Sequence, residues 1–224
     1  MKKRLDEQRD HWEKTFAENP DLFGAGPSEA GRLAADLIRA ENRTEVLEFG
    51  GGQGRDALFL ARNGFRVRVL DYSERAVEAI AAKARRLRLS GAVEALRHDL
   101  REPLPFADES FDACYSHMLF CMALTTAELE FAFAEARRVL RPNGLHIYTV
   151  RTTEDPHYGA GIFRGEGMYE VDGFVVHFFD REKVPRLAAG DEIVRFFGFE
   201  EGDLPRRLFF VAMRKGGMPG GASG

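Results

Sequence analysis

Short apolar runs alternate along this chain with longer segments in which apolar residues recur at helical spacing. The first kind of segment is typical of a buried strand, and the second of a helix packed on one face. Because strands that alternate with helices form parallel sheets with helices on both faces, the pattern predicts an α/β fold. The strands are expected over residues 44–49, 65–70, 92–96, 111–116 and 145–150.

The helices between these strands carry their own start signals. Ser28 and Ser73 precede helical patterns that run to Ala40 and Leu89, and a serine at that position caps the first free amides of a helix. Thr125 and Glu128 have the spacing of a capping box for a helix over 127–140.

The two ends of the chain depart from this alternation. A helix is expected over 5–16, and Asp180 can cap a short helix that ends at Gly190. The strands expected over 192–199 and 208–213 have only a short polar segment between them, which predicts an antiparallel hairpin. The fold class is therefore α/β, a Rossmann-like doubly wound, mostly parallel seven-stranded sheet with an antiparallel C-terminal hairpin.

Composition narrows the class of protein only slightly. A length of 224 residues, with 44% hydrophobic and 30% charged residues, suits one globular domain, expected over 1–215, with a glycine-rich, disordered tail over 216–224. The net charge of −4 gives no reason to expect a nucleic-acid partner. Cys114 and Cys121 are too few for a disulfide framework or a zinc site, so no metal is predicted. Without a signal peptide or a membrane-length apolar run, we expect a cytoplasmic protein with no membrane partner, as a monomer or homodimer.

The segment after the first strand carries the chemistry. Gly50, Gly52 and Gly54 follow the apolar run 46–49 and precede a helical pattern. A glycine turn between a strand and a helix lets a ligand approach the backbone, because glycine has no Cβ and accepts positive φ. Asp71 ends the second strand, where an acid can accept hydrogen bonds from ribose hydroxyls. Together these features predict a nucleoside-binding site.

Two nucleoside cofactors are compatible with this turn. Residues 52–57 fit the loose dinucleotide pattern G-x-G-x-x-G/A, with Asp71 near the expected distance. Residues 48–54 fit E-x-G-x-G-x-G, in which Glu48 lies inside the strand. A carboxylate at that position would repel a pyrophosphate but attract a sulfonium and an α-ammonium group. The charge of Glu48 therefore favours S-adenosylmethionine.

The order of further motifs strengthens this interpretation. Residues 44–150 resemble the class I S-adenosylmethionine-dependent methyltransferases, with Arg97-His-Asp-Leu100 at the adenine position, Phe111-Asp-Ala-Cys-Tyr-Ser116 as the fourth strand and Arg137-Arg-Val-Leu-Arg-Pro-Asn-Gly144 before the fifth. The resemblance implies the following cofactor-binding residues: Glu48, Gly50, Gly52, Gly54, Asp71, Tyr72, Asp99, Leu100 and Ser116.

Within that family, residues 51–65 most resemble the tellurite-resistance and thiopurine-type group. Such relatives methylate small, soft nucleophiles, so the resemblance implies in-line transfer to a thiol or to a tellurium or selenium oxyanion. Cys-Tyr-Ser-His stands after strand four in place of an Asn-Pro-Pro-Tyr type motif, which argues against methylation of nucleic-acid bases. A nicotinamide-dependent oxidoreductase and a catalytically silent nucleoside-binding module remain as alternatives.

The acceptor site is expected at the carboxyl edge of the sheet, where such folds bind ligands. His117 and Tyr115, at the end of strand four, are the catalytic candidates. Residues 1–40 are expected to form a helical cover around a cofactor-binding core over 44–150, and residues 151–179 are long enough to be a substrate lid. Candidate acceptor contacts in the cover and the lid are Trp12, His157, Arg164, Tyr169 and His177.

Overall fold

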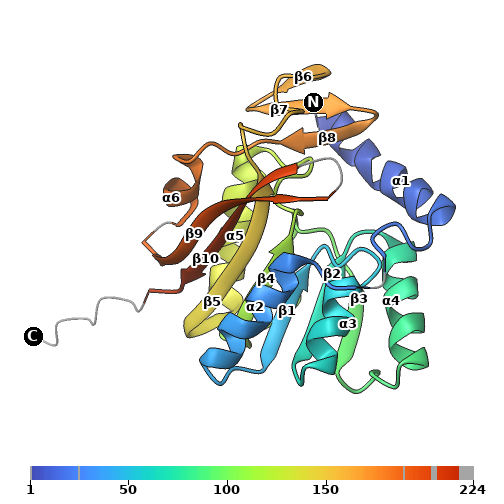
Figure 1. Ribbon diagram of the computed structural model, residues 1–224, viewed down its shortest axis with the longest axis vertical. Helices are drawn as coiled ribbons and strands as arrows, with labels where there is room; N and C mark the ends of the chain where they lie inside the picture. The colour runs from blue at the N-terminus through green and yellow to red at the C-terminus, as the bar shows by residue number, and fades with distance from the viewer. Residues whose placement is uncertain (1, 25, 189, 203–205, 217–224) are drawn as a thin grey trace, which may run out of the picture.

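A computed structural model describes residues 2–24, 26–188, 190–202 and 206–216, and most of the predicted tail over 216–224 lies outside these residues (Figure 1). Seven strands form one sheet in the order β3-β2-β1-β4-β5-β10-β9, in which β10 runs antiparallel to both of its neighbours. The predicted fold class and the closing hairpin are confirmed. The strands are β1 (Glu45–Phe49), β2 (Arg66–Asp71), β3 (Val93–Arg97), β4 (Phe111–His117), β5 (Leu140–Arg151), β9 (Glu192–Glu201) and β10 (Arg206–Arg214).

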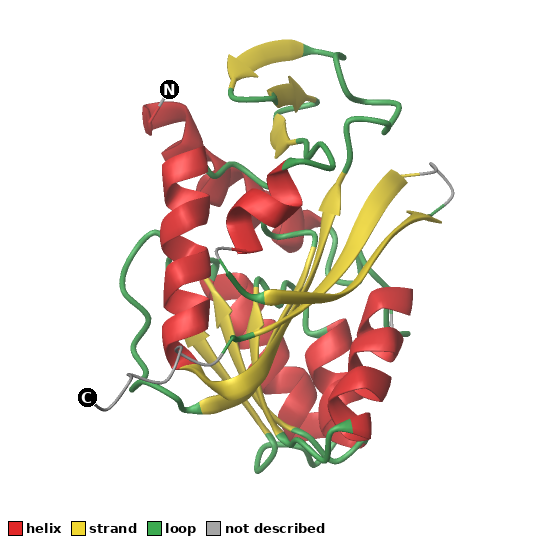
Figure 2. Cartoon of the chain, turned by 90° about the vertical axis from the view of Figure 1, so that its left-hand side faces the viewer, coloured by secondary structure: helices red, strands yellow, loops and turns green. Residues whose placement is uncertain are grey.

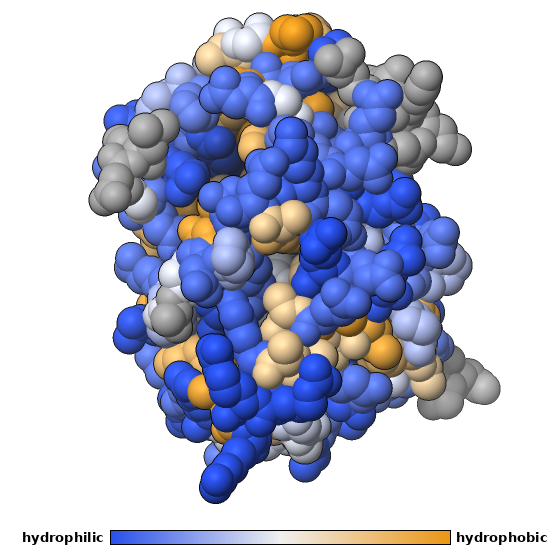
Figure 3. Space-filling model, turned by 90° about the vertical axis from the view of Figure 1, so that its right-hand side faces the viewer, coloured by the Kyte–Doolittle hydropathy of each residue, from blue (hydrophilic) through white to orange (hydrophobic). Residues whose placement is uncertain are grey.

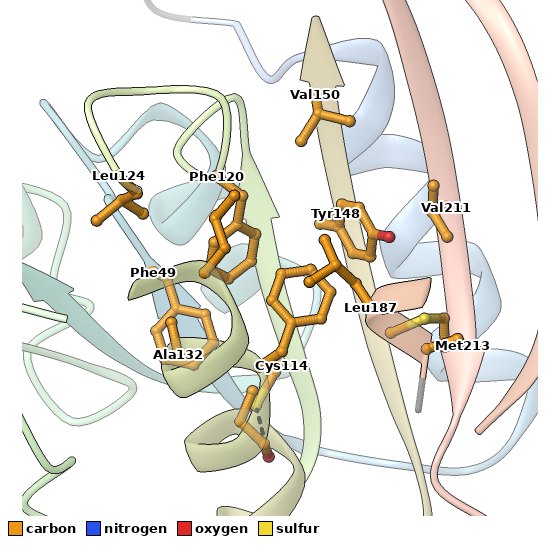
Figure 4. Packing of buried hydrophobic residues seen from close by; sticks show 14 of the residues in the cluster. Phe49, Cys114, Phe120, Leu124, Ala132, Tyr148, Val150, Leu187, Val211 and Met213 are labelled. Atoms are coloured by element: carbon orange, nitrogen blue, oxygen red, sulfur yellow. Dashed lines mark hydrogen bonds between the residues drawn. The ribbon is translucent and has the colours of Figure 1, made fainter. Parts of the chain in front are cut away.

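Helices cover both faces of this sheet. Buried side chains of α2 (Glu29–Ala40), α3 (Arg55–Arg62) and α4 (Glu74–Arg86) pack on one face, and those of α5 (Thr126–Val139) and α6 (Lys183–Ala188) on the other. On the α5 face, the rings of Phe49, Phe120 and Tyr148 form a fully enclosed aromatic layer (Figure 4). Each such buried apolar side chain stabilises the fold by roughly 1.5–3 kcal/mol.

Local signals fix where the helices begin. Ser28 accepts a hydrogen bond from the amide of Gly31, and Ser73 accepts one from that of Ala76. Both halves of the capping box between Thr125 and Glu128 are present. These three predicted caps are confirmed, since the first free amides of each helix find a side-chain acceptor next to them.

A second, three-stranded sheet lies above the carboxyl edge of the large one, where both views place it apart from the main sheet (Figures 1 and 2). It consists of β6 (Ile162–Gly165), β7 (Met168–Val171) and β8 (Phe174–His177), and we call it the lid sheet. The sequence pattern did not predict these strands, because four residues are too few to show a periodicity. Ile162 and Phe163 on β6 are 54% and 60% exposed.

The N-terminal helix α1 (Lys2–Glu18) joins the lid sheet to the main body. The Gln8 amide donates to the carbonyl of Gly173 (2.9 Å) and accepts from the amide of Val175 (3.0 Å), at the edge of β8. Five residues further along α1, Glu13 accepts a hydrogen bond from the amide of Glu74 (2.6 Å) at the start of α4. The helix is therefore fastened to both parts.

The predicted cover over 1–40 needs a correction. Only α1 and the turn after it lie by the lid sheet and the glycine turn, because the buried face of α2, including Ala34 and Ile38, packs on the main sheet. The side of the molecule that carries α1 and α4 is mostly hydrophilic (Figure 3). None of the described helices is long and apolar enough to cross a membrane.

Candidate cofactor and acceptor site

The glycine turn between β1 and α3 has the backbone that the sequence pattern predicts. Gly50, Gly52 and Gly54 have φ values of 67°, 52° and 84°, a region that residues with a side chain rarely adopt. A Cβ atom added at Gly52 would lie 3.2 Å from the ring of Phe23 and one at Gly50 would lie 2.8 Å from Leu119. The turn is therefore built for close approach to its backbone.

Asp71 closes this turn from the end of β2. Its carboxylate accepts hydrogen bonds from the amides of Gly52 and Ser73, each at 2.9 Å. Burial raises the pKa of Asp71 to about 6, although these two amides oppose the shift. The side chain is thus held at the edge of the turn, and the remaining lone pairs of its two oxygens can accept from ligand hydroxyls.

Glu48 differs from Asp71 in the hydrogen bonding of its buried carboxyl group. Its side chain is almost fully buried on β1, and its Oε2 atom has no hydrogen-bonding partner among the described residues. Burial, and then the negative charges of Asp56 and Asp71, raise the pKa of Glu48 well above its usual value. An unpaired buried carboxyl group is costly, and a neighbouring cation would relieve that cost.

A sulfonium nucleoside with an amino-acid side chain fits these residues. The glycine turn presents its backbone without side chains, Asp71 offers acceptors at the end of β2, and Glu48 has an oxygen without a partner among the described residues. Ser116, which lies opposite Phe49 on β4, also has a buried hydroxyl without a partner among the described residues. The prediction that it contacts the cofactor remains a prediction.

Tyr115 is placed differently from the catalytic role predicted for it. Its side chain is fully buried, and its hydroxyl donates to Asp56 (2.8 Å) on the α3 face of the sheet. Asp56 also accepts from the amide and the hydroxyl of Ser28, at 2.7 and 2.6 Å. Tyr115 therefore helps to fasten the start of α2 to α3. It has no hydroxyl free to act on an acceptor, and the prediction is corrected.

Three further predicted cofactor residues lie around the ends of β2 and β3. Asp99 is half-buried, and Arg101 binds its carboxylate with bonds of 3.0 and 2.7 Å. Burial works against ionisation of Asp99, yet the bonds from Arg101 hold its pKa below the usual range. Tyr72 is half-buried beside Asp71, and burial raises its pKa. Leu100 packs against the α5-side core. Their contacts with a cofactor remain predictions.

His117 ends β4 at the carboxyl edge, level with the start of the glycine turn. Its Nδ1 atom lies 2.9 Å from the hydroxyl of Thr149 on β5, and its Nε2 atom 2.9 Å from the carboxylate of Glu201 at the end of β9. The next residue, Met118, has a φ of 60° and donates its amide to Thr149 at 3.0 Å. No sequence pattern pointed to Glu201, because 84 residues separate it from His117.

The candidate lid residues divide into two groups. His177 is fully enclosed, with Nδ1 2.6 Å from the carbonyl of Leu124 and Nε2 bonded to Lys183, so it fastens the lid sheet to the loop after β4. Burial lowers the pKa of His177 to about 4. Because the ring is fully buried and both of its nitrogens are bonded, the predicted substrate contact is corrected.

The other lid candidates lie further out. Arg164 is half-buried and bonded to Glu170 (2.7 Å), and the ring of Tyr169 lies 5.3 Å from that of Tyr158. His157 is half-buried in the turn that precedes the lid sheet. Whether these side chains touch an acceptor remains a prediction.

Trp12 belongs to a row of four aromatic rings that runs from the glycine turn to the lid sheet. Phe23 lies over Gly52, and the row continues through Phe16 and Trp12 to Phe174, with centroid distances of 6.2, 5.3 and 4.8 Å. These four rings form an apolar, aromatic surface beside the glycine turn.

Comparisons with known proteins bear on the fold and the class of this chain. Residues 46–144 match the family described as "Methyltransferase domain". The chain is 29% identical over 199 residues to 24-methylenesterol C-methyltransferase 2 of Oryza sativa subsp. japonica, covering 84% of this chain and 51% of the relative. The chain thus spans about half the length of that curated relative.

Solved structures share the fold. The 1,6-didemethyltoxoflavin-N1-methyltransferase of Burkholderia thailandensis, with bound S-adenosylhomocysteine, superposes with a TM-score of 0.74 at 18% identity, covering 94% of this chain and 88% of that chain. TehB from Haemophilus influenzae superposes with a TM-score of 0.66 at 14% identity, covering 91% and 67%.

The strand order, the glycine turn and the matched domain together define a class of protein. The chain has the fold of S-adenosylmethionine-dependent methyltransferases, and its residues 46–144 match the methyltransferase domain family. The domain match favours S-adenosylmethionine over the nicotinamide alternative.

Proposed function

We propose that this chain transfers a methyl group from S-adenosylmethionine to a small-molecule nucleophile, of which a thiol is the preferred type. The observation that carries the proposal is the buried carboxyl oxygen of Glu48 beside the glycine turn, which has no hydrogen-bonding partner among the described residues. Asp71 supports it from the end of β2. We assign the ribose hydroxyls to Asp71 and the positive charge of the amino-acid part to Glu48.

The bound cofactor would supply an electrophilic methyl group whose leaving sulfur departs uncharged, so no acid is needed to assist it. The contribution of the protein is to position the two reactants. Holding two reactants in line can lower the barrier by roughly 7–11 kcal/mol. The aromatic row that includes Trp12, together with the lid sheet, would exclude water from the carboxyl edge of the sheet.

A thiol also has to lose its proton. We assign that proton to His117, the imidazole at the end of β4, because general-base catalysis by a positioned side chain contributes about 10²–10⁴-fold. A tellurium or selenium oxyanion, already charged, would need no base. Both acceptors suit the soft methyl–sulfonium centre.

One observation favours a second type of acceptor. The row Phe23, Phe16, Trp12 and Phe174 offers an apolar surface suited to a ring-bearing molecule. The rice relative is called a methylenesterol C-methyltransferase, which makes an apolar acceptor the second candidate.

Calorimetric titration tests the cofactor first. S-adenosylhomocysteine should bind with micromolar affinity and NADPH should not. Gly52→Val should abolish the binding, because a side chain at this positive-φ position would meet Phe23 and block the approach to the backbone. Gly91→Ala, at a glycine with nothing around its Cβ position, is the matched control. Mass-spectrometric detection of methylated products from thiols, selenite, tellurite and apolar ring compounds then ranks the acceptors. Binding without turnover on any of them would point to a silent nucleoside-binding module.

A further inference from the structure

The ring of His117 is held between two elements that are distant in sequence. Thr149 lies on β5, directly beside β4, whereas Glu201 lies at the end of β9, in the hairpin that leans over the carboxyl edge (Figure 1). The side chains of His117 and Glu201 are 11% and 20% exposed, so the contact is largely shielded from solvent.

For the neutral ring, one placement of the proton suits both partners. A carboxylate can only accept, so Nε2 carries the proton that bonds to Glu201. Nδ1 then holds the lone pair and accepts from the hydroxyl of Thr149, whose oxygen also accepts from the amide of Met118 at 3.0 Å.

Glu201 is kept ionised by its surroundings. Burial opposes its charge, but the hydrogen bond from His117, the positive charge of that ring when it is protonated, and the charges of Arg55 and Arg206 hold its pKa below the usual range. A carboxylate of that kind is a poor base for a thiol. It is well suited to balance a positive charge that forms on the neighbouring imidazole.

We propose that Glu201 is the positioning residue of the acceptor site, which holds His117 as the Nε2–H tautomer and stabilises the imidazolium formed when Nδ1 takes the acceptor's proton. This inference rests on the proposed function. For the thiol S–H to reach Nδ1, the buried hydroxyl of Thr149 has to turn away from that nitrogen. The carbon–sulfur bond to the acceptor forms while the methyl–sulfonium bond breaks, its electron pair stays on the cofactor sulfur, and the proton passes to Nδ1.

The first test needs neither cofactor nor acceptor. Nitrogen-15 NMR of the full chain with labelled histidine should give the His117 signals of a neutral ring protonated at Nε2. Glu201→Gln should lose this single tautomer, because an amide can either donate or accept. A native ring protonated at Nδ1, or a tautomer unchanged by Glu201→Gln, would overturn the proposal.

The second test distinguishes a loss of proton removal from a general structural defect. With 2-mercaptoethanol as acceptor, Glu201→Gln should lower kcat by about a hundredfold or more, in line with the loss of a working general base. With iodide, which has no proton to lose, kcat should stay within about threefold. An equal loss with both acceptors would mean a structural role and would refute the assignment.

Glu200→Gln is the matched control, because Glu200 is the adjacent carboxylate and pairs with Arg207 at the exposed side of β9. It should leave kcat and the tautomer of His117 unchanged. If the native chain binds S-adenosylhomocysteine but methylates neither probe, the proposed acceptor class fails, whereas the NMR result still decides the role of Glu201.

Discussion

Single side chains decide the cofactor site. Asp71 receives two backbone amides and still has lone pairs for ribose, while Glu48 has an oxygen without a partner among the described residues. The two acids therefore differ: Asp71 organises the turn, and Glu48 is proposed to pair with the positive charge of the cofactor.

Asp71→Ala should weaken the binding of S-adenosylhomocysteine by about 1.5–3 kcal/mol, the value of hydrogen bonds to a charged group, or roughly ten- to a hundredfold in affinity. Calorimetry on the variant and the native chain measures the change. Glu94→Ala, which removes an exposed acid on the neighbouring strand β3, should have no effect. Native affinity in Asp71→Ala would remove this residue from the site.

The pKa of Asp71 also predicts a pH dependence. Because burial raises it to about 6 in the folded chain, the carboxylate is protonated below that pH and loses acceptor strength. Affinity for S-adenosylhomocysteine should rise as pH increases through about 6 and then level off. Asp71→Asn should bind more weakly and lack this step. The same raised pKa means that ionising Asp71 costs folding stability, a cost absent below about pH 4 and complete above about 6.

At the scale of elements, α1 connects the start of α4, next to Asp71, with the lid sheet. Gln8 pairs with the edge of β8 much as a neighbouring strand would, and Glu13 caps α4 next to Asp71. Two contacts at different ends of one helix couple the ribose side of the site to the lid sheet.

Gln8→Ala should uncouple these two parts. In native protein, binding of S-adenosylhomocysteine is expected to slow hydrogen exchange both in α1 and in the lid sheet over 162–177. In Gln8→Ala the protection should persist near α4 but fall in the lid sheet, because the bond to the amide of Val175 is lost. Glu7→Ala, an exposed neighbour, serves as control. Equal lid protection in both variants would contradict the coupling.

Several elements followed from the sequence and others did not. The caps at Ser28, Ser73 and Thr125 were predictable because each acts within one helical turn. The lid sheet was not, because its strands of four residues are defined by pairing with each other and with Gln8 rather than by periodicity.

For the molecule as a whole, the N-terminal segment is expected to contribute more to cofactor binding and activity than to folding stability. Deletion of residues 1–27 removes α1 and Phe23 but retains Ser28 and the packing of α2 on the sheet. Activity and affinity for S-adenosylhomocysteine should fall at least about tenfold, the value of roughly 1.4 kcal/mol. The thermal midpoint should change little, as followed by circular dichroism. A parallel loss of midpoint and affinity would mean that the segment merely docks.

The sequence by itself determined the sheet, its closing hairpin, the glycine turn and the class of cofactor. These depend on periodicity, on caps and on a charged residue inside a strand, all of which act over a few neighbouring residues. Only the tertiary structure decided which candidates share a site. Tyr115 and His177 proved to be enclosed by their own hydrogen bonds, while Glu201 came to lie against His117 across the folded sheet. Such contacts depend on how strands twist and pack, which no local pattern encodes.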